Sequence, residues 1–208
     1  MLYKTYNYFD TTLKSDNINI NAAITTFINH LSQFKSTNIV ENMYHTNSQD
    51  STERRKRLKE FLIKNQNAKI LLVGEAPGYN GCAKTGVPFT SNTNEPSSAV
   101  IQSFLSRNYP QIPVLMWNAF PFHPHQPNQT ESNRAPNSEE LALGYFILQS
   151  FIKIFPNLTY YCAIGRTAEK QLLKINLPTQ PIYIRHPAHG GKTKCIEALN
   201  QFFKQVYN

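Results

Sequence analysis

The sequence is poor in cysteine and acidic residues, and it has no long apolar run. Its three cysteines, Cys82, Cys162 and Cys195, contain no CxxC pair and cannot all be joined in disulfides. We therefore expect a reduced, intracellular protein, which we assign to the cytoplasm, without a cysteine-based metal site. No apolar stretch reaches the ~18 residues of a membrane helix. The first 17 residues are polar and aromatic, unlike a signal peptide.

Acidic residues are outnumbered by basic ones. Asp and Glu number 13 against 21 Lys and Arg, so the formal net charge is +8 and the pI is about 9.4. A basic balance favours a polyanionic partner, with nucleic acid as the first candidate. Charge alone does not decide this, because many basic proteins bind no nucleic acid.

The length of 208 residues suits one domain. A domain of this size buries about 70% of its unfolded surface and needs no disulfide bonds or structural metal for stability.

Short apolar segments alternate with helical patterns along the chain. We predict strands at residues 69–73, 112–117, 159–164 and 180–184. We predict helices at residues 20–34, 96–107, 138–155, 166–175 and 191–206, and another capped by Ser51 or Thr52. This alternation predicts an α/β fold, a three-layer α/β/α sandwich around a four-stranded parallel sheet. We take residues 1–208 as a single domain, with residues 1–50 as a helical N-terminal extension.

Two polar segments leave their roles open. The run Arg54-Arg-Lys-Arg57 is interpreted first as a solvated helix face, with contacts to phosphates as the alternative. The loop at residues 119–137 is rich in Pro, His and Asn, and loops of this length usually carry function. Within it, His123 and His125 have a spacing that suggests a metal, but no third ligand is in sight. We favour a loop that lies near nucleic acid.

Polar, titratable or glycine-rich residues follow each predicted strand. The strands lead in turn into Gly74-Glu-Ala-Pro-Gly78, Asn118, Gly165-Arg166 and Arg185-His-Pro-Ala-His-Gly-Gly-Lys192. In open parallel sheets, ligands bind at the carboxyl ends of the strands. We therefore expect the four segments to converge on one rim and to form a ligand site there.

The segment Gly190-Gly-Lys-Thr193 resembles the end of a phosphate-binding P-loop. The glycine that the full pattern needs five positions before Gly191 is replaced by His186. We therefore do not expect a nucleoside triphosphate site. A glycine-rich helix start can instead offer backbone N–H groups to a nucleic-acid phosphate.

These motifs together resemble the uracil-DNA glycosylase superfamily. Gly74-Glu-Ala-Pro-Gly78 and Gly86-Val-Pro-Phe89 are similar to the first motif and following turn of its Gly-Glu-x-Pro-Gly bacterial and archaeal branch. Asn118 corresponds to the Asn of the second motif, and His186-Pro-Ala188 to the last motif. The resemblance covers about residues 69–200. That branch usually carries four cysteines for an iron–sulfur cluster, whereas this chain has three and no suitable pair, so we expect no cofactor and no metal.

The resemblance implies a role for each matched residue. Glu75 would orient or activate the attacking water, and His186 would hydrogen-bond the O2 atom of the base as negative charge builds there. The base-binding residues would be Phe89, Asn118, Gly74 and Tyr79: Phe89 would stack on the base, Asn118 would read its edge, and Tyr79 would exclude a 5-methyl group. Purely structural interpretations also exist: core packing for Phe89, a turn for Asn118, loop packing for His186 and a surface carboxylate for Glu75.

Contacts to DNA are expected from residues after the last two strands, namely Arg166, Arg185, His189, Gly190, Gly191 and Lys192. Arg166 has the alternative role of simply beginning a helix. The overall prediction is a monomeric DNA glycosylase of base-excision repair. It would hydrolyse the N-glycosidic bond of a flipped-out uracil, or a related deaminated base, in DNA, with uracil-containing DNA as its partner and no membrane association. The alternatives are an inactive uracil- or DNA-binding module with the same fold, such as a replication accessory, and a hydrolase of free nucleotides or nucleosides.

Overall fold

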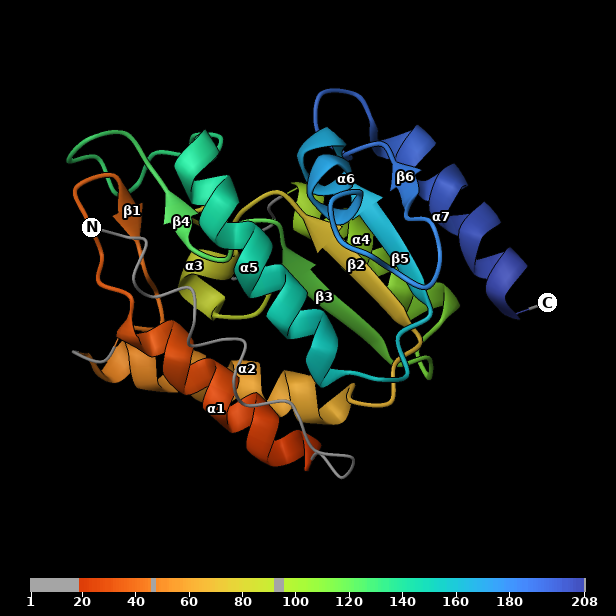
Figure 1. Ribbon diagram of the computed structural model, residues 1–208. Coiled ribbons are helices and arrows are strands. Elements are labelled where there is room, and N and C mark those ends of the chain that lie inside the picture. Colours follow the sequence, from red (N-terminus) through yellow and green to blue (C-terminus); the bar gives the residue numbers. More distant parts are fainter. Residues whose placement is uncertain (1–18, 46–47, 92–95, 208) are drawn as a thin grey trace.

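A four-stranded parallel sheet forms the centre of the protein. The computed structural model describes residues 19–45, 48–91 and 96–207 (Figure 1). The strands are β2 (Ile70–Gly74), β3 (Val114–Asn118), β5 (Tyr160–Ile164) and β6 (Ile182–Ile184), in the order β3-β2-β5-β6. Gly74 pairs with Asn118 across β2 and β3, so the last residues of these strands lie side by side. The predicted four-stranded parallel sheet is confirmed.

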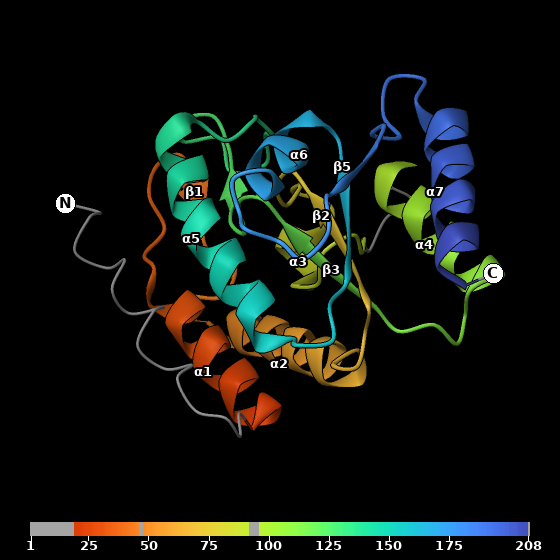
Figure 2. The ribbon, with the colours of Figure 1, turned by 45° about the vertical axis from the view of Figure 1, so that its right-hand side comes forward.

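Helices cover both faces of the sheet, which confirms the α/β/α sandwich. Leu71 and Val73 point to a core shared with α1 (Ile20–Gln33), α2 (Gln49–Lys64), α5 (Ser138–Ile154) and α6 (Arg166–Leu172). Ile70 and Leu72 point to a second core, shared with α4 (Pro96–Asn108) and α7 (Lys192–Tyr207). Figure 2 shows α4 and α7 together on their side of the sheet. Because both faces are buried, β2 is a continuous apolar run rather than an alternating one.

Helix α1 is packed into the first of these cores. The Phe27 ring lies 5.4 Å from the Trp117 ring and 5.7 Å from the Phe151 ring, between centroids. Trp117 in turn stacks on Phe151 at 4.4 Å. These three rings join α1, β3 and α5, so the part of the N-terminal segment that the structure describes shares its core with the sheet.

Helix boundaries follow the capping residues. The N-cap of α1 is Asn19, whose side chain accepts a hydrogen bond from the Ala22 N–H, and α5 has a capping box formed by Asn137 and Glu140. The predicted cap of α2 is wrong: the helix begins at Gln49, and Ser48 is the cap. Ser51, one of the two expected caps, is buried in the first turn and donates its N–H to Ser48 Oγ at 3.2 Å.

Helix α6 is shorter than predicted. It ends at Leu172, and the chain continues in tight turns. In these turns the Lys174 N–H donates to Gln171 O, and the Ile175 N–H donates to Leu172 O. Three short elements were not predicted: β1 (Val40–Glu41), β4 (His123–Pro124) and α3 (Cys82–Thr85). They are too short to produce a periodic pattern. The antiparallel pair of β1 and β4 ties the N-terminal segment to the loop at residues 119–137.

The arginines at the start of α2 make hydrogen bonds to the backbone that neither sequence interpretation included. Arg54, Arg55 and Arg57 donate hydrogen bonds to backbone carbonyl oxygens of Lys84, Tyr44 and Thr85, respectively. The run is therefore not merely a solvated face, and contacts of these arginines with phosphates stay a prediction. In the part of the chain that the structure describes, no helix is long and apolar enough to cross a membrane.

Candidate functional site

A cavity of about 500 Å³ lies at the carboxyl ends of the parallel strands. Six of the residues predicted for the site line it: Gly74, Glu75, Phe89, Asn118, His186 and His189. They come from the end of β2, the turn after α3, the end of β3 and the loop between β6 and α7. Of the four segments that the sequence predicts to converge, those after β2, β3 and β6 line this cavity, whereas Gly165-Arg166 after β5 is not among its lining residues.

Gly74 leaves room for the side chains of two residues that line the cavity, Phe89 and Asn118. A Cβ atom at this position would lie 2.8 Å from Phe89 Cζ and 2.9 Å from Asn118 Oδ1. Both distances are shorter than ordinary van der Waals contact. The ring and the amide can therefore lie over the end of β2 only because residue 74 has no side chain.

Phe89 adopts a backbone conformation that is unusual for an aromatic residue. Its φ angle is +57°, in the left-handed region. Non-glycine residues in this region are uncommon, and they persist where the surroundings fix them. The conformation belongs to the turn Gly86-Val-Pro-Phe89 and aims the half-buried ring into the cavity.

Backbone hydrogen bonds fix the turn that carries Glu75. The Ala119 N–H donates to Gly74 O at 2.8 Å, and the Phe120 N–H donates to Glu75 O at 3.0 Å. Further along the turn, the Pro77 carbonyl oxygen lies 2.9 Å from His123 Nδ1. The Glu75 residue is half-buried at the cavity wall, so its backbone is fixed while water can still reach its side chain.

His186 is held in one neutral tautomer. The Ala188 N–H donates to His186 Nδ1 at 3.2 Å, so Nδ1 must be unprotonated and the ring proton lies on Nε2. Burial lowers the pKa of His186, and the nearby His189 lowers it further. The imidazole is therefore neutral at pH 7. The hydrogen bond from the Ala188 N–H keeps the ring proton on Nε2, so Nε2–H can act as a hydrogen-bond donor.

The family model described as the uracil DNA glycosylase superfamily matches residues 61–206. The chain belongs to this superfamily. The crystal structure of wild-type SMUG2 from Pedobacter heparinus has a TM-score of 0.63 at 19% identity, over 90% of this chain and 97% of that chain. At this identity the likeness shows the shared fold. Among curated proteins, none matches the sequence.

In this member of the uracil DNA glycosylase superfamily, Tyr79 is not among the cavity-lining residues. Its N–H donates to Asn133 Oδ1 and its hydroxyl donates to Glu131 Oε1, both at 2.9 Å. The Lys84 ammonium lies 4.1 Å from the ring centroid, a cation–π contact. Tyr79 is thus fixed beside the cavity, and Asn133, which sequence reasoning missed, reaches the cavity wall instead. No strand-end motif points to Asn133, because it lies within the loop at residues 119–137.

The residues predicted to contact DNA lie around the cavity rather than in it, apart from His189. Arg166 begins α6, pairs with Glu169 at 2.7 Å and stacks over the Tyr183 ring at 3.9 Å from the centroid. Arg185 is exposed and donates to the His189 carbonyl oxygen at 3.3 Å. These cations have local partners and still present their charge at the rim.

The glycines before α7 have different surroundings. Gly190 has a φ angle of +73° and open space around it, whereas a Cβ atom at Gly191 would lie 2.1 Å from the His186 carbonyl oxygen. Lys192 is exposed at the start of α7. The close packing at Gly191 therefore fixes the backbone of the loop that carries His186.

His123 and His125 have structural roles that their spacing did not reveal. Both are buried, with exposed fractions of 0% and 1%, so the interpretation of a loop near nucleic acid does not describe their side chains. His123 lies 2.9 Å from the carbonyl oxygens of Pro77 and Thr130 through its two ring nitrogens. It joins the Glu75 turn to the 119–137 loop. Within the described residues, no group of three His, Cys, Asp or Glu side chains could hold a metal ion.

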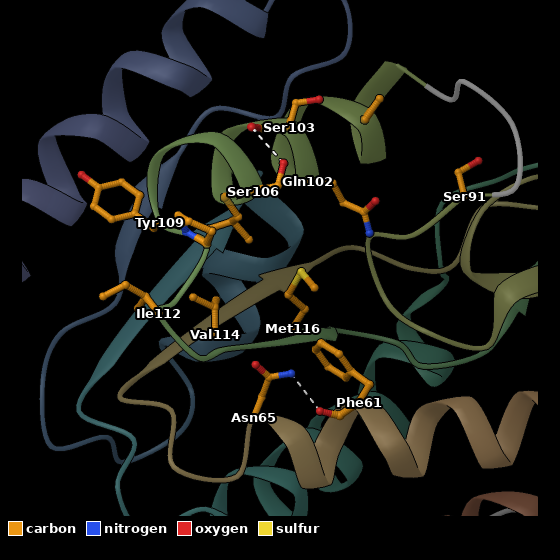
Figure 3. A pocket seen from close by; sticks show the side chains of 13 residues that line it. Phe61, Asn65, Ser91, Gln102, Ser103, Ser106, Tyr109, Ile112, Val114 and Met116 are labelled. Atoms are coloured by element: carbon orange, nitrogen blue, oxygen red, sulfur yellow. Dashed lines mark hydrogen bonds between the residues drawn. The ribbon is translucent and has the colours of Figure 1, made fainter.

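A second cavity of about 500 Å³ lies along the free edge of β3 (Figure 3). Its side chains come from α2, α4 and β3, as Phe61, Gln102 and Met116 illustrate. Among the described residues that line it there is no Asp, Glu, His, Lys or Arg. It therefore offers no carboxylate or imidazole for acid–base chemistry, unlike the cavity at the strand ends.

Proposed function

We propose that this protein is a DNA glycosylase that hydrolyses the N-glycosidic bond of uracil, or of a related deaminated base, flipped out of DNA. The observation that carries the proposal is the convergence of Glu75, Phe89, Asn118 and His186 on one cavity at the carboxyl ends of the strands. Membership of the uracil DNA glycosylase superfamily supports the same activity.

The base would be bound by stacking and by its polar edge. A base in a duplex is inaccessible, so it must leave the stack and enter the cavity. Stacking on the Phe89 ring contributes about 1–3 kcal/mol for any base. The Asn118 amide, with one acceptor and two donors, suits the N3–H and O4 of uracil. Cytosine presents the reverse pattern there, and the unpaired polar atoms that result would discriminate against it.

Bond cleavage would separate charge between the base and the sugar. As the bond from the base N1 to C1′ breaks, its electron pair passes to the base and negative charge gathers on O2. The Nε2–H of neutral His186 would donate a hydrogen bond to that oxygen. Glu75 would stabilise the cationic sugar and accept a proton from the water that attacks C1′. The base leaves as the uracil anion and takes up a proton from solvent, and Glu75 releases the proton that it accepted, so the products are free uracil and an abasic site.

The basic surface would hold the DNA backbone. The exposed residues Arg166, Arg185 and Lys192 are candidates for phosphate contacts, together with the backbone N–H groups of the loop before α7. Such contacts position the strand without reading its sequence. Binding should therefore weaken steeply with salt, while the choice of base depends on the cavity.

An excision assay tests the proposal. The protein is incubated with an end-labelled strand that carries one uracil, alone or paired with G or A, and alkali then converts abasic sites to breaks. We expect breaks with the wild type and their loss in Glu75→Ala and His186→Ala. The matched control is Glu60→Ala, which removes an exposed carboxylate of α2. Tight binding of uracil-containing DNA without breaks would reject hydrolysis and favour a binding module. Cleavage of free deoxyuridine in preference to DNA would favour a nucleoside hydrolase.

A further inference from the structure

Three consecutive backbone carbonyl groups at the end of α3 accept hydrogen bonds from side chains of a distant segment. The Tyr44 hydroxyl donates to Gly86 O at 2.8 Å, and Arg54 Nε donates to Lys84 O at 3.2 Å. Arg57 donates to Thr85 O at 3.4 Å through Nη1. The carbonyl groups at a helix end have no partner within the helix. We call Tyr44, Arg54 and Arg57 the carbonyl clamp.

One donor of the carbonyl clamp, Tyr44, is itself fixed by neighbouring groups. Tyr44 is buried, with an exposed fraction of 1%. Its N–H donates to Asn42 Oδ1 at 2.9 Å, and its carbonyl oxygen accepts from Arg55 at 2.8 Å. The Asn42 amide donates to the carbonyl oxygens of Leu31 and Phe34, each at 2.7 Å. The clamp is therefore anchored to the C-terminal end of α1.

Backbone packing at Gly86 adds to these hydrogen bonds. Gly86 has a φ angle of +80°, and a Cβ atom there would lie 2.6 Å from Arg54 Cβ and 2.8 Å from Arg54 Cα. Helix α2 thus touches the turn directly, without an intervening side chain. Only glycine meets both requirements, the left-handed conformation and the close approach.

The clamped segment leads straight into the cavity. Gly86 is followed by Val87, Pro88 and Phe89, whose φ angle of +57° must be fixed by its surroundings. Cys82, at the other end of α3, is buried and lines the cavity. The clamped carbonyl groups of residues 84–86 thus lie between two residues that line the cavity, Cys82 and Phe89.

From these contacts we infer that Tyr44, Arg54 and Arg57 are positioning residues that hold the Phe89 ring where a base stacks. They lie outside residues 61–206, the range that the family model matches. The inference rests on the proposed function for its catalytic consequence. Its structural part, the restraint of residues 84–89, stands independently of any activity.

The variant Tyr44→Phe tests the restraint, because it removes one hydroxyl and keeps the ring. The matched control is Tyr161→Phe, which removes a buried hydroxyl that donates to Leu158 O at 3.2 Å, at the opposite end of the sheet. Hydrogen exchange is followed by mass spectrometry on the full-length protein. Leaving the Gly86 carbonyl unpaired should speed exchange in residues 82–90 by about tenfold. Unchanged exchange there, or equal acceleration in Tyr161→Phe, would overturn the clamp.

The catalytic consequence is tested by a double-mutant cycle with Phe89→Ala. Single-turnover excision of uracil should slow by about 3- to 30-fold in Tyr44→Phe, while affinity for DNA with an abasic-site analogue stays unchanged. In the Phe89→Ala background, Tyr44→Phe should have an effect below about twofold, because the ring through which it acts is gone. Equal effects in both backgrounds would overturn the positioning role.

The two readouts separate this inference from the proposed function. A wild type that excises no uracil rejects the proposed function and with it the catalytic role of the clamp, whereas hydrogen exchange still decides the restraint. A wild type that excises uracil, with additive effects in the cycle, rejects the positioning role alone. Faster exchange in residues 82–90 together with non-additive excision supports the whole inference.

Discussion

The substitution Gly74→Ala should damage the cavity more than it damages the fold. The new Cβ atom would lie 2.8 Å from Phe89 Cζ and 2.9 Å from Asn118 Oδ1. Ordinary carbon–carbon contacts are about 3.5–4.0 Å, so the ring would have to move by about 0.7 Å or more. Strand β2 is paired on both sides, with β3 and β5, so its backbone cannot give way. The displacement falls on the two side chains that we assign to base binding.

The magnitude follows from the geometry. A misplacement of about 1 Å in an active site can slow a reaction by ~100-fold, so we expect single-turnover excision to fall by about 10- to 100-fold. Overpacking costs about 1–3 kcal/mol of the free energy of unfolding, which corresponds to a Tm lower by about 3–10 °C for a protein of this size. The excision rate constant is measured with protein in excess over a single-uracil oligonucleotide, and Tm by circular dichroism.

The control separates the cavity from general destabilisation. Ile101→Val removes one methylene from the core between α4 and the sheet and costs about 0.5–1.5 kcal/mol. It should lower Tm and leave excision within about twofold of the wild type. Excision by Gly74→Ala at the wild-type rate would refute the reasoning, and so would an equal loss in Ile101→Val. In a Phe89→Ala background, the effect of Gly74→Ala should shrink, because one of the two clashes is absent.

Three further predictions concern charged and titratable groups. Glu75→Gln should slow excision by about 100- to 10,000-fold while DNA affinity, measured by fluorescence anisotropy, is retained; a rate near that of the wild type would exclude the carboxylate from catalysis. The pKa of His186 should lie below its ordinary value, with the proton on Nε2, when imidazole nitrogens are observed by NMR. His189→Gln should raise this pKa only partly, because burial is the larger cause. With this lowered pKa, His186 takes up a proton in the unfolded chain but not in the folded chain, so it lowers the free energy of unfolding as pH falls below about 6.5. His186→Asn should weaken this pH dependence. The same dependence of the unfolding free energy on pH in both proteins would contradict the assignment. Arg134→Met should lower the free energy of unfolding by about 3–5 kcal/mol in urea titrations, because it leaves the buried Glu140 carboxylate without its cationic partner and with only the hydrogen bond from the Asn137 N–H. Restoration by a second substitution, Glu140→Met, would support the pairing, whereas a loss below about 1 kcal/mol would contradict it.

The sequence by itself determined the sheet and the position of the cavity. Apolar runs such as residues 70–73 can be buried on both faces only in a parallel sheet with helices on each side, and the direction of a strand fixes what lies at its carboxyl end. Glu75 and His186 follow β2 and β6, and Asn118 ends β3, so their convergence was predictable without coordinates. These are local features, because the apolar run of a strand and the residues that follow it are neighbours in the sequence.

Only the tertiary structure decided how the turn with Phe89 is held. Tyr44 and Gly86 are 42 positions apart, and Arg54 and Lys84 are 30 apart, so no local pattern joins them. The burial of His123 and the contact between Tyr79 and Asn133 likewise depend on how the 119–137 loop docks on the Glu75 turn. A side chain that donates a hydrogen bond to a distant carbonyl group produces no periodic pattern in the sequence. Tertiary packing determines its partner, because packing brings segments that are far apart in the sequence into contact.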